Sequence, residues 1–158
     1  MSKTLYLVRH AKSDWSTDMN DFQRPLNKRG RRDAPEMGRR LIKHHASPDS
    51  IVCSPAKRAI ETAELLNLGS AVYDESIYEA SVDALLKIIR SLDDHHNSAM
   101  LIGHNPAMTW LARELSGSHI ENLPTCAVVT IRLATRHWKK AGTCPARMLD
   151  LDYPRKKA

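Results

Sequence analysis

The chain has 158 residues, 42% of them hydrophobic and 27% charged, with a formal net charge of +6, and this size and composition predict a globular protein with a single domain over residues 1–158. No segment approaches the ~20 apolar residues of a transmembrane helix, and the apolar run 4–8 is too short for a signal peptide, so we expect a cytoplasmic protein with no membrane partner. The cysteines, Cys53, Cys126 and Cys144, are odd in number and lack paired spacing, which argues against a disulfide framework or a cysteine metal site.

The N-terminal part of the chain predicts a strand, a long loop and a helix. Residues 4–8 are apolar without alternation, as in a buried parallel strand. Residues 11–29 lack a helical period, and a loop of this length in a compact domain is often functional. Residues 30–45 have apolar side chains at helical spacing, although Pro35 predicts either a helix start near Asp33 or a kink.

The middle of the chain repeats the alternation of strand and helix. Residues 50–53 predict a short strand. Ser54-Pro55 then resembles a helix N-cap with proline at the first helical position. This helix is expected to end near Gly69, before a third short strand over residues 71–73.

A second strand-and-helix unit follows in the C-terminal half. Ser81 is expected to open a helix, and residues 98–102 predict the next strand. Asn105-Pro106 repeats the cap-and-proline pattern and predicts another helix, which ends near Gly117.

The order of these elements predicts the fold class. Residues 127–133 and 146–151 predict two late strands that form a hairpin-like edge. Strands alternate with helices over the rest of the chain, which is the pattern of a layered α/β fold. We therefore expect a three-layer α/β architecture with a mostly parallel central sheet flanked by helices.

Polar residues follow several of the predicted strands at the point where each strand ends. Because the carboxyl ends of parallel strands meet at one edge of a sheet, these side chains are expected to share one site. They are Arg9 and His10 after the first strand, Ser54 and Arg58 after the second, Glu79 after the third, and His104 and Asn105 after the fourth.

Two arginines and two histidines around one point would form a cationic pocket that suits a phosphoryl group. Nearby positive charge should keep His10 neutral, so that it can act as the nucleophile. Arg9 and Arg58 would hold the equatorial oxygens, and His104 would donate a hydrogen bond to the transferring group. Glu79 is the candidate proton donor to the leaving group and the candidate activator of water.

Five motifs in this order resemble the histidine phosphatase superfamily, which contains the cofactor-dependent phosphoglycerate mutases. The motifs are Leu7-Val8-Arg9-His10-Ala11, Arg24-Pro25-Leu26-Asn27, Ser54-Pro55-Ala56-Lys57-Arg58-Ala59-Ile60-Glu61-Thr62-Ala63, Tyr78-Glu79-Ala80 and Gly103-His104-Asn105-Pro106. The resemblance spans residues 4 to about 117. It implies one histidine phosphatase domain with a phosphoglycerate mutase-like fold and a phosphohistidine intermediate at His10. Arg9, Arg58 and His104 would complete its phosphate pocket, and no metal or other cofactor is expected.

Two features narrow the resemblance to the short SixA branch of phosphohistidine protein phosphatases. Ala11 follows the Arg-His pair where mutases usually have glycine, and the chain lacks the long insertion with which mutases recognise a sugar phosphate. Glu79 is less clearly matched in short members of this kind. A protonated phosphoramidate nitrogen leaves more easily than an alkoxide, so a phosphohistidine substrate needs less help from an acid. Arg24 and Asn105 are further candidates for binding the substrate.

Four functions are compared at the level of sequence, of which the first fits the residues best. The first is a phosphatase for a phosphorylated protein or for a small phosphate ester, and the second is a phosphoglycerate mutase-like phosphotransferase. A nucleic-acid-binding module would explain the net positive charge, but acidic residues interleave with the basic ones and no aromatic-basic motif is present, so no nucleic-acid partner is expected. The fourth is an inactive binder of phosphoproteins. The oligomeric state is not predicted.

Overall fold

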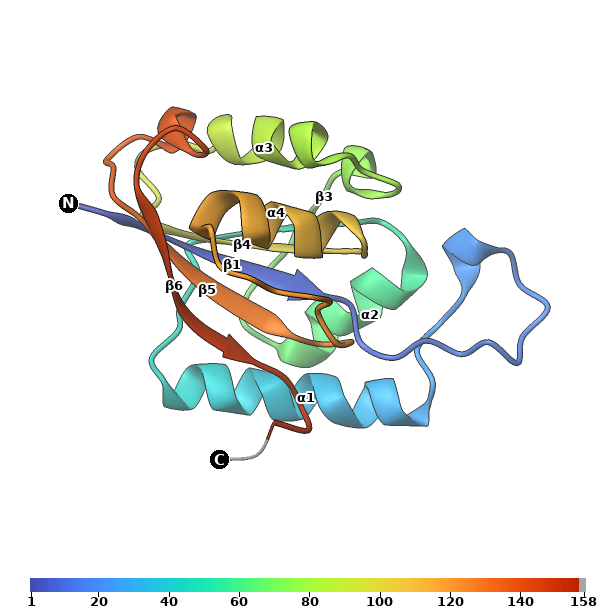
Figure 1. The fold of residues 1–158 in the computed structure, drawn as a ribbon. Coiled ribbons are helices and arrows are strands. Elements are labelled where there is room, and N and C mark those ends of the chain that lie inside the picture. Colours follow the sequence, from blue (N-terminus) through green and yellow to red (C-terminus); the bar gives the residue numbers. More distant parts are fainter. Residues whose placement is uncertain (157–158) are drawn as a thin grey trace.

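The computed structural model, which describes residues 1–156, has a six-stranded sheet between two layers of helices (Figure 1). The strands are β1 (Lys3–Arg9), β2 (Ser50–Cys53), β3 (Val72–Tyr73), β4 (Ser98–Gly103), β5 (Val128–Leu133) and β6 (Ala146–Asp152). The helices are α1 (Lys28–Lys43), α2 (Lys57–Leu66), α3 (Val82–Arg90) and α4 (Ala107–Ser116), with short 3₁₀ helices η1 (Asp21–Gln23), η2 (Glu75–Ile77) and η3 (Trp138–Lys140). The strand order is β3-β2-β4-β1-β5-β6.

Strand β1 lies inside the sheet, parallel to β4 on one side and antiparallel to β5 on the other. Strand β2 pairs in parallel with both β3 and β4, whereas β5 and β6 pair as antiparallel neighbours. In Figure 1, α3 and α4 cover one face of the sheet, and α1 and α2 cover the other. The predicted three-layer α/β fold with a mostly parallel sheet is therefore confirmed, as is the hairpin-like edge.

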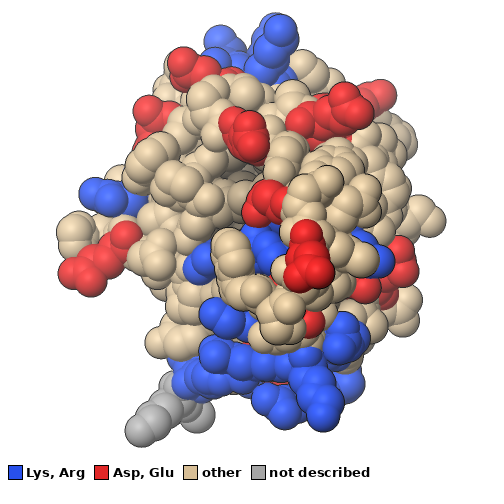
Figure 2. Space-filling model, turned by 90° about the vertical axis from the view of Figure 1, so that its right-hand side faces the viewer, with Lys and Arg blue, Asp and Glu red and all other residues tan. Residues whose placement is uncertain are grey.

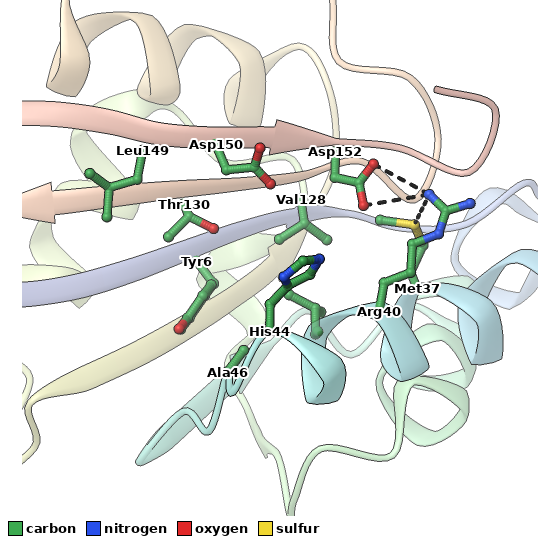
Figure 3. Close-up of a pocket in the computed structure, with 11 residues that line it drawn as sticks. Tyr6, Met37, Arg40, His44, Ala46, Val128, Thr130, Leu149, Asp150 and Asp152 are labelled. Atoms are coloured by element: carbon green, nitrogen blue, oxygen red, sulfur yellow. Dashed lines mark hydrogen bonds and ion pairs between the residues drawn. The ribbon is translucent and has the colours of Figure 1, made fainter. Parts of the chain in front are cut away.

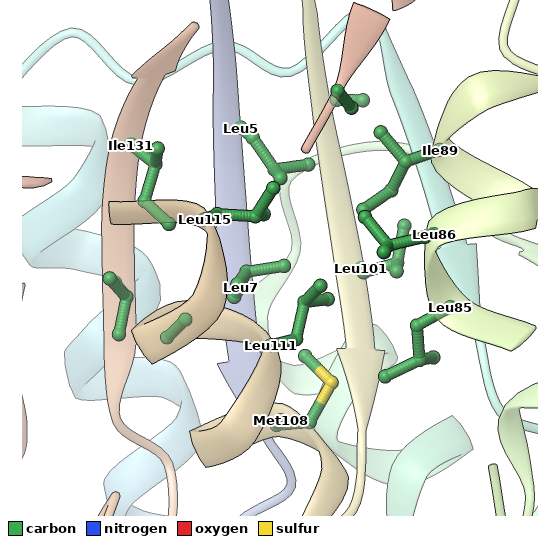
Figure 4. Packing of buried hydrophobic residues seen from close by; sticks show 14 of the residues in the cluster. Leu5, Leu7, Leu85, Leu86, Ile89, Leu101, Met108, Leu111, Leu115 and Ile131 are labelled. Carbon is green, nitrogen blue, oxygen red and sulfur yellow. The ribbon is translucent and has the colours of Figure 1, made fainter. Parts of the chain in front are cut away.

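Successive side chains of β1 enter the apolar cores on the two faces of the sheet. Leu5 and Leu7 belong to the cluster beneath α3 and α4, whereas Val8 belongs to the cluster beneath α1 and α2. Figure 4 shows Leu5 and Leu7 close to α4, with Leu111 from that helix and Leu101 from β4 in the same layer. Burial on both faces explains why β1 and β4 are continuous apolar runs rather than alternating ones.

Helix α1 begins earlier than the sequence predicted and continues through its proline. The Asn27 side chain caps it by accepting a hydrogen bond from the backbone N–H of Gly30 at 2.9 Å. The predicted start near Asp33 is therefore wrong, and Pro35 lies inside the helix. Packing of the buried face of α1 against the sheet offsets the hydrogen bond that proline cannot donate.

Helix α2 begins at Lys57, later than Ser54-Pro55 predicted, and it has no side-chain cap. The Ser54 hydroxyl forms a hydrogen bond within the candidate site instead. The helix ends at Asn67, whose φ of 55° is left-handed, and so it stops before the predicted Gly69. The first correction arises because the Ser54 hydroxyl has a partner distant in the sequence. The second arises because asparagine, like glycine, can end a helix in the left-handed conformation.

Helix α4 begins at Ala107, one residue later than the pair Asn105-Pro106 predicted. The Asn105 side-chain oxygen accepts hydrogen bonds from the backbone N–H and the hydroxyl of Thr109, at 3.2 and 2.8 Å. Asn105 therefore caps α4 from the position just before Pro106, the residue at the N-cap. The helix ends at Gly117 with a φ of 68°, as the sequence predicted.

A cavity of about 410 Å³ lies between α1 and the outer strands of the sheet (Figure 3). It is lined by Tyr6, Met37, Arg40, Leu41, His44, Ala46, Val128, Thr130, Leu149, Asp150 and Asp152. On one side of it, Arg40 of α1 forms an ion pair with Asp152 of β6 at 3.3 Å. This ion pair ties α1 to the edge strand, and the cavity is separate from the residues predicted for the functional site.

Candidate active site

A pocket of about 190 Å³ lies where β1 and β4 end. Six of the eight residues predicted for the site line it together. The lining residues are Arg9, His10, Lys12, Ser13, Trp15, Arg24, Arg58, His104, Asn105 and Thr125. The topology of the sheet thus brings these side chains to one place, as expected for the carboxyl ends of parallel strands. Of the other two, Ser54 lies behind the lining and bonds to His104, and Glu79 is not among the lining residues.

The His10 ring is buried and held in one orientation. Its backbone N–H donates to the Gly103 carbonyl at 3.0 Å, and its carbonyl accepts from the Cys126 N–H at 3.0 Å. Its Nδ1 lies 2.7 Å from the Ala11 carbonyl. Because a carbonyl oxygen only accepts, Nδ1 must carry the proton, and Nε2 must carry the free lone pair. Nε2 is therefore the nitrogen that can attack.

Both histidines of the pocket are held neutral. Burial lowers the pKa of His10 well below its ordinary value of 6.5, and the neighbouring His104, Arg58 and Arg9 lower it further. Burial, followed by the charge of Arg58, lowers the pKa of His104 to about 4. The two ring centroids are 5.1 Å apart. A neutral imidazole at neutral pH is what nucleophilic attack requires.

Arg9 and Arg58 approach the pocket from the ends of β1 and the first turn of α2. Arg9 donates from Nη1 to the Leu123 carbonyl at 2.7 Å, and burial lowers its pKa. The Nε atoms of both arginines are buried with no hydrogen-bond partner among residues 1–156, as is Nδ1 of His104. Unpaired buried N–H groups are costly, so these guanidinium groups fit a ligand that supplies acceptor oxygens.

Asp21 is a site residue that the sequence did not reveal. Its carboxylate accepts hydrogen bonds from Arg58 Nη2 at 2.9 Å, Arg24 Nη2 at 2.6 Å and the Tyr78 hydroxyl at 2.6 Å. Burial alone would raise the pKa of Asp21, but the hydrogen bonds from Tyr78, Arg24 and Arg58 outweigh it and hold that pKa well below its usual value. The carboxylate, which is 49% exposed, is therefore an anion of the protein itself beside the arginine pair.

Arg24 comes from the long loop between β1 and α1, as the sequence analysis expected of a functional loop. Its guanidinium also donates to the Ser13 hydroxyl. The exposed indole of Trp15 stacks on it, with 3.6 Å between the guanidinium carbon and the ring centroid. This contact places Trp15 at the rim of the pocket, where it forms part of the wall.

Asn105 lines the pocket, but its side chain is fully engaged by the protein. The amide nitrogen donates to the Asn122 side chain at 2.9 Å and to the Leu123 carbonyl at 3.0 Å, and its oxygen caps α4. Since the Leu123 carbonyl also binds Arg9, Asn105 holds the segment that orients the arginine. This geometry favours an indirect effect on the pocket over direct contact with a ligand.

Glu79 does not join the predicted site residues. Its side chain is exposed, it does not line the pocket, and its backbone φ of 57° turns the chain just after η2. The expectation that the third strand would deliver Glu79 to the common edge therefore needs correction. The neighbouring Tyr78 reaches the site instead, through its hydrogen bond to Asp21 and an edge-on contact with the His104 ring at 5.6 Å.

The chemistry of the pocket suits a small oxyanion. Its donors are guanidinium, imidazole and hydroxyl groups from the residues named above, and Figure 2 shows Lys and Arg atoms at the centre of this face of the molecule. Within residues 1–156, no group of three or more His, Cys, Asp or Glu side chains is arranged to hold a metal ion. In the same part of the chain, no helix is long and apolar enough to cross a bilayer.

Comparison with known families agrees with this donor set. The family model of the histidine phosphatase superfamily (branch 1) matches residues 5–85, just over half of the 158 residues. The chain belongs to this superfamily. The matched residues include Arg9, His10, Arg24, Arg58 and Glu79, whereas His104 lies beyond the match.

Similar proteins come from several bacteria. An uncharacterized protein of Mycobacterium tuberculosis is 29% identical over 159 residues, which covers 94% of this chain and all of that protein. A structure from Nakamurella multipartitia, named as a SixA phosphohistidine phosphatase, superposes with a TM-score of 0.91 at 22% identity, over 99% of this chain and 98% of that one. A structure of the same name from Agrobacterium tumefaciens has a TM-score of 0.83 at 25% identity, over 98% and 100% of the two chains. Both superpositions extend over nearly the whole of this chain, and membership of the superfamily supports phosphatase activity.

Proposed function

We propose that the protein is a phosphohistidine phosphatase that removes the phosphoryl group from a phosphorylated protein through a covalent phosphohistidine on His10. The observation that carries this proposal is the His10 ring. It is buried and neutral, its Nδ1 proton is directed to the Ala11 carbonyl, and its Nε2 lone pair is free, in a pocket lined by three arginines.

The first step transfers the phosphoryl group to the enzyme. His10 Nε2 attacks phosphorus, and the bond from phosphorus to the substrate imidazole breaks as the new bond forms. The guanidinium groups of Arg9 and Arg58 neutralise the charge on the equatorial oxygens. Arg58 exchanges the Asp21 carboxylate for phosphate oxygens in this step. The Ala11 carbonyl stabilises the positive charge that develops on the His10 ring, because that charge strengthens the bond from Nδ1–H.

The second step releases inorganic phosphate. A water molecule attacks the phosphorus of phospho-His10, and the electron pair of the P–N bond returns to Nε2. The products are neutral His10 and phosphate, so each cycle consumes one phosphohistidine and one water. His104, held by the Ser54 hydroxyl at 2.7 Å, donates a hydrogen bond to the transferring group in both steps.

The position of Glu79 favours a phosphohistidine substrate over an alkyl phosphate ester. Within the described residues, the pocket lining contains no carboxylic acid, so no side chain of that kind stands ready to protonate an alkoxide leaving group. The imidazole of a protonated phosphohistidine is a better leaving group and needs no such acid. The SixA names of the structural neighbours support the same choice.

A substitution at His10 tests the mechanism. We expect His10→Ala to abolish hydrolysis of a phosphohistidine peptide and of an aryl phosphate, with an unchanged circular dichroism spectrum, because the ring is the nucleophile. Glu79→Gln serves as the comparison and should keep phosphohistidine hydrolysis within about twofold.

Trapping the intermediate makes the test decisive. Rapid quenching of the wild-type protein with labelled substrate should yield a phosphoenzyme that is stable to base and labile to acid, and His10→Ala should yield none. Full activity of His10→Ala, or an acid-stable phosphoenzyme, would show that the proposed mechanism is wrong.

A further inference from the structure

The first turns of α1 carry a concentration of positive charge that helix stability does not explain. Lys28, Arg29, Arg31 and Arg32 are all exposed, and the first turn has no acidic residue. The N-terminus is the positive end of the helix dipole, where acidic residues stabilise and basic residues destabilise. The side chains of Lys28 and Arg32 form no ion pair or hydrogen bond within residues 1–156. We call these four residues the basic rim.

The basic rim lies directly beside the candidate active site. The backbone N–H of Asn27 donates to the Lys12 carbonyl at 3.0 Å. A Cβ at Gly30 would lie only 2.2 Å from the same carbonyl oxygen, so the first turn of α1 rests on the backbone of Lys12. Lys12 itself lines the pocket, two residues after His10. Figure 2 shows the result as a band of Lys and Arg below the centre of this face.

The pocket is too small to explain the rim. Its volume of about 190 Å³ suits a phosphoryl group with little attached to it, and His10 at its base is 7% exposed. None of the four rim side chains lines the pocket. They can reach only groups that lie outside the pocket, on the body that carries the phosphoryl group.

We propose that the basic rim docks an acidic protein surface that surrounds the phosphohistidine of the substrate. This inference rests on the proposed phosphatase function and adds the chemistry of the partner. Exposed ion pairs are individually weak, but several like charges at the mouth of a site raise the rate of association with an oppositely charged partner. The exposed Trp15 at the rim of the pocket offers an apolar contact beside the docked phosphohistidine.

The distribution of charge favours a protein over a polyanion as the partner. Figure 2 shows separate Asp and Glu side chains over the upper part of the same face, with a further group of Lys and Arg only at its top edge. A nucleic acid or an anionic membrane would extend over both regions and meet repulsion from the acidic one. A protein can present an acidic patch to the rim and other groups to the rest of the face.

Matched peptides test the proposal. One phosphohistidine peptide carries glutamates on both sides of the phosphorylated residue, and the other carries glutamines at the same positions. At low ionic strength the wild-type protein should show a kcat/KM about tenfold higher for the glutamate peptide. Lys28→Glu with Arg32→Glu should remove this preference and leave the glutamine peptide within about twofold of wild type.

The chain offers a control pair of equal charge. Lys139 and Lys140 are exposed on η3, at the end of the molecule away from the long loop in Figure 1. Lys139→Glu with Lys140→Glu should keep the preference for the glutamate peptide. A wild-type ratio near one, or an equal loss in the control pair, would overturn the docking proposal.

Binding of peptides with a non-hydrolysable phosphohistidine analogue separates docking from catalysis. If no phosphohistidine peptide is hydrolysed, the proposed function fails, and the docking proposal is judged by whether the analogue peptides still show the charge preference. Single-stranded RNA and vesicles of phosphatidylcholine with phosphatidylserine provide the remaining comparison. Tighter binding of either than of the glutamate peptide, lost in the rim variant, would overturn the assignment to an acidic protein.

Discussion

At the scale of single residues, the main feature of the pocket is that both of its histidine rings stay unprotonated. Burial and the nearby guanidinium groups lower the pKa of both His10 and His104. The same arginines that would bind a phosphoryl group therefore also keep the proposed nucleophile unprotonated. One set of charges thus serves both binding and reactivity.

The lowered pKa of His104 predicts a specific dependence of stability on pH. In the unfolded chain His104 takes up a proton near pH 6.5, whereas in the folded protein its pKa is about 4. As the pH falls from 6.5 toward 4, the unfolded chain takes up a proton on His104 that the folded protein does not bind. The free energy of unfolding therefore decreases over this range and is unaffected by His104 above it. By linkage, this loss amounts to about 3 kcal/mol in the free energy of unfolding between pH 7 and pH 4.

Urea denaturation of wild-type protein and of His104→Asn over that range measures the contribution. The wild-type protein should lose about 3 kcal/mol more than the variant. Parallel curves for the two proteins would show that His104 titrates normally in the folded state.

Asp21 predicts an effect on the binding of anions. Its carboxylate competes with phosphate oxygens for Arg58 and Arg24, so Asp21→Asn should tighten inhibition by orthovanadate, a phosphate mimic, by about fivefold. Asp18→Asn is the matched control, because Asp18 is an exposed carboxylate in the same loop. Weaker inhibition in Asp21→Asn would mean instead that Asp21 holds the arginines in place for the anion.

At the scale of elements, close packing between α1 and α2 depends on a glycine. A Cβ at Gly38 of α1 would lie 2.2 Å from the Leu66 carbonyl oxygen at the end of α2. The alternation of strands with helices was predictable because local periodicity and breaker residues reveal it. The exact start of α2 was not, because the Ser54 hydroxyl bonds to His104, which lies 50 residues away in the sequence. The start of α1 was missed although its cap, Asn27, is a local signal.

Because of the Gly38 contact, the effect of Gly38→Ala on the free energy of unfolding should be opposite in sign to the effect expected from helix propensity. Alanine in place of a helical glycine ordinarily stabilises a helix by about 0.5–1 kcal/mol. We expect Gly38→Ala to lower the free energy of unfolding by about 1–3 kcal/mol, since the backbone of α2 must move to make room. Arg39→Ala, at an exposed neighbouring position, should change it by less than about 0.5 kcal/mol. Stabilisation by Gly38→Ala would show that the two helices separate without cost.

At the scale of the whole molecule, the sheet divides the interior into two apolar clusters, and β1 and β4 contribute to both. The active site lies at one end of these two strands. The geometry of the site therefore depends on the packing of these central strands, although the core side chains of β1 and β4 do not themselves line the pocket. The net charge of +6 acts at this scale too, through the basic rim beside the pocket.

A cavity in the central strand should destabilise the whole fold. Leu101 of β4 is fully buried, so Leu101→Ala should lower the free energy of unfolding by about 2–5 kcal/mol. Leu149→Ala, at a position 39% exposed on the edge strand β6, is the control and should cost less than about 1.5 kcal/mol. Chemical denaturation measures both, and equal losses would contradict the assignment of β4 to the structural centre.

The sequence by itself determined the order of the elements, the mostly parallel sheet and the convergence of Arg9, His10, Arg58 and His104. Each of these follows from local signals, because apolar runs form the buried strands and the polar residues come where those runs stop. Only the tertiary structure decided that Asp21 joins the arginines and that Glu79 does not. Asp21 lies 37 residues before Arg58 in the sequence, so no local signal reveals their contact. Glu79 adopts a backbone φ of 57°, which non-glycine residues rarely adopt, so the strand pattern did not predict its position.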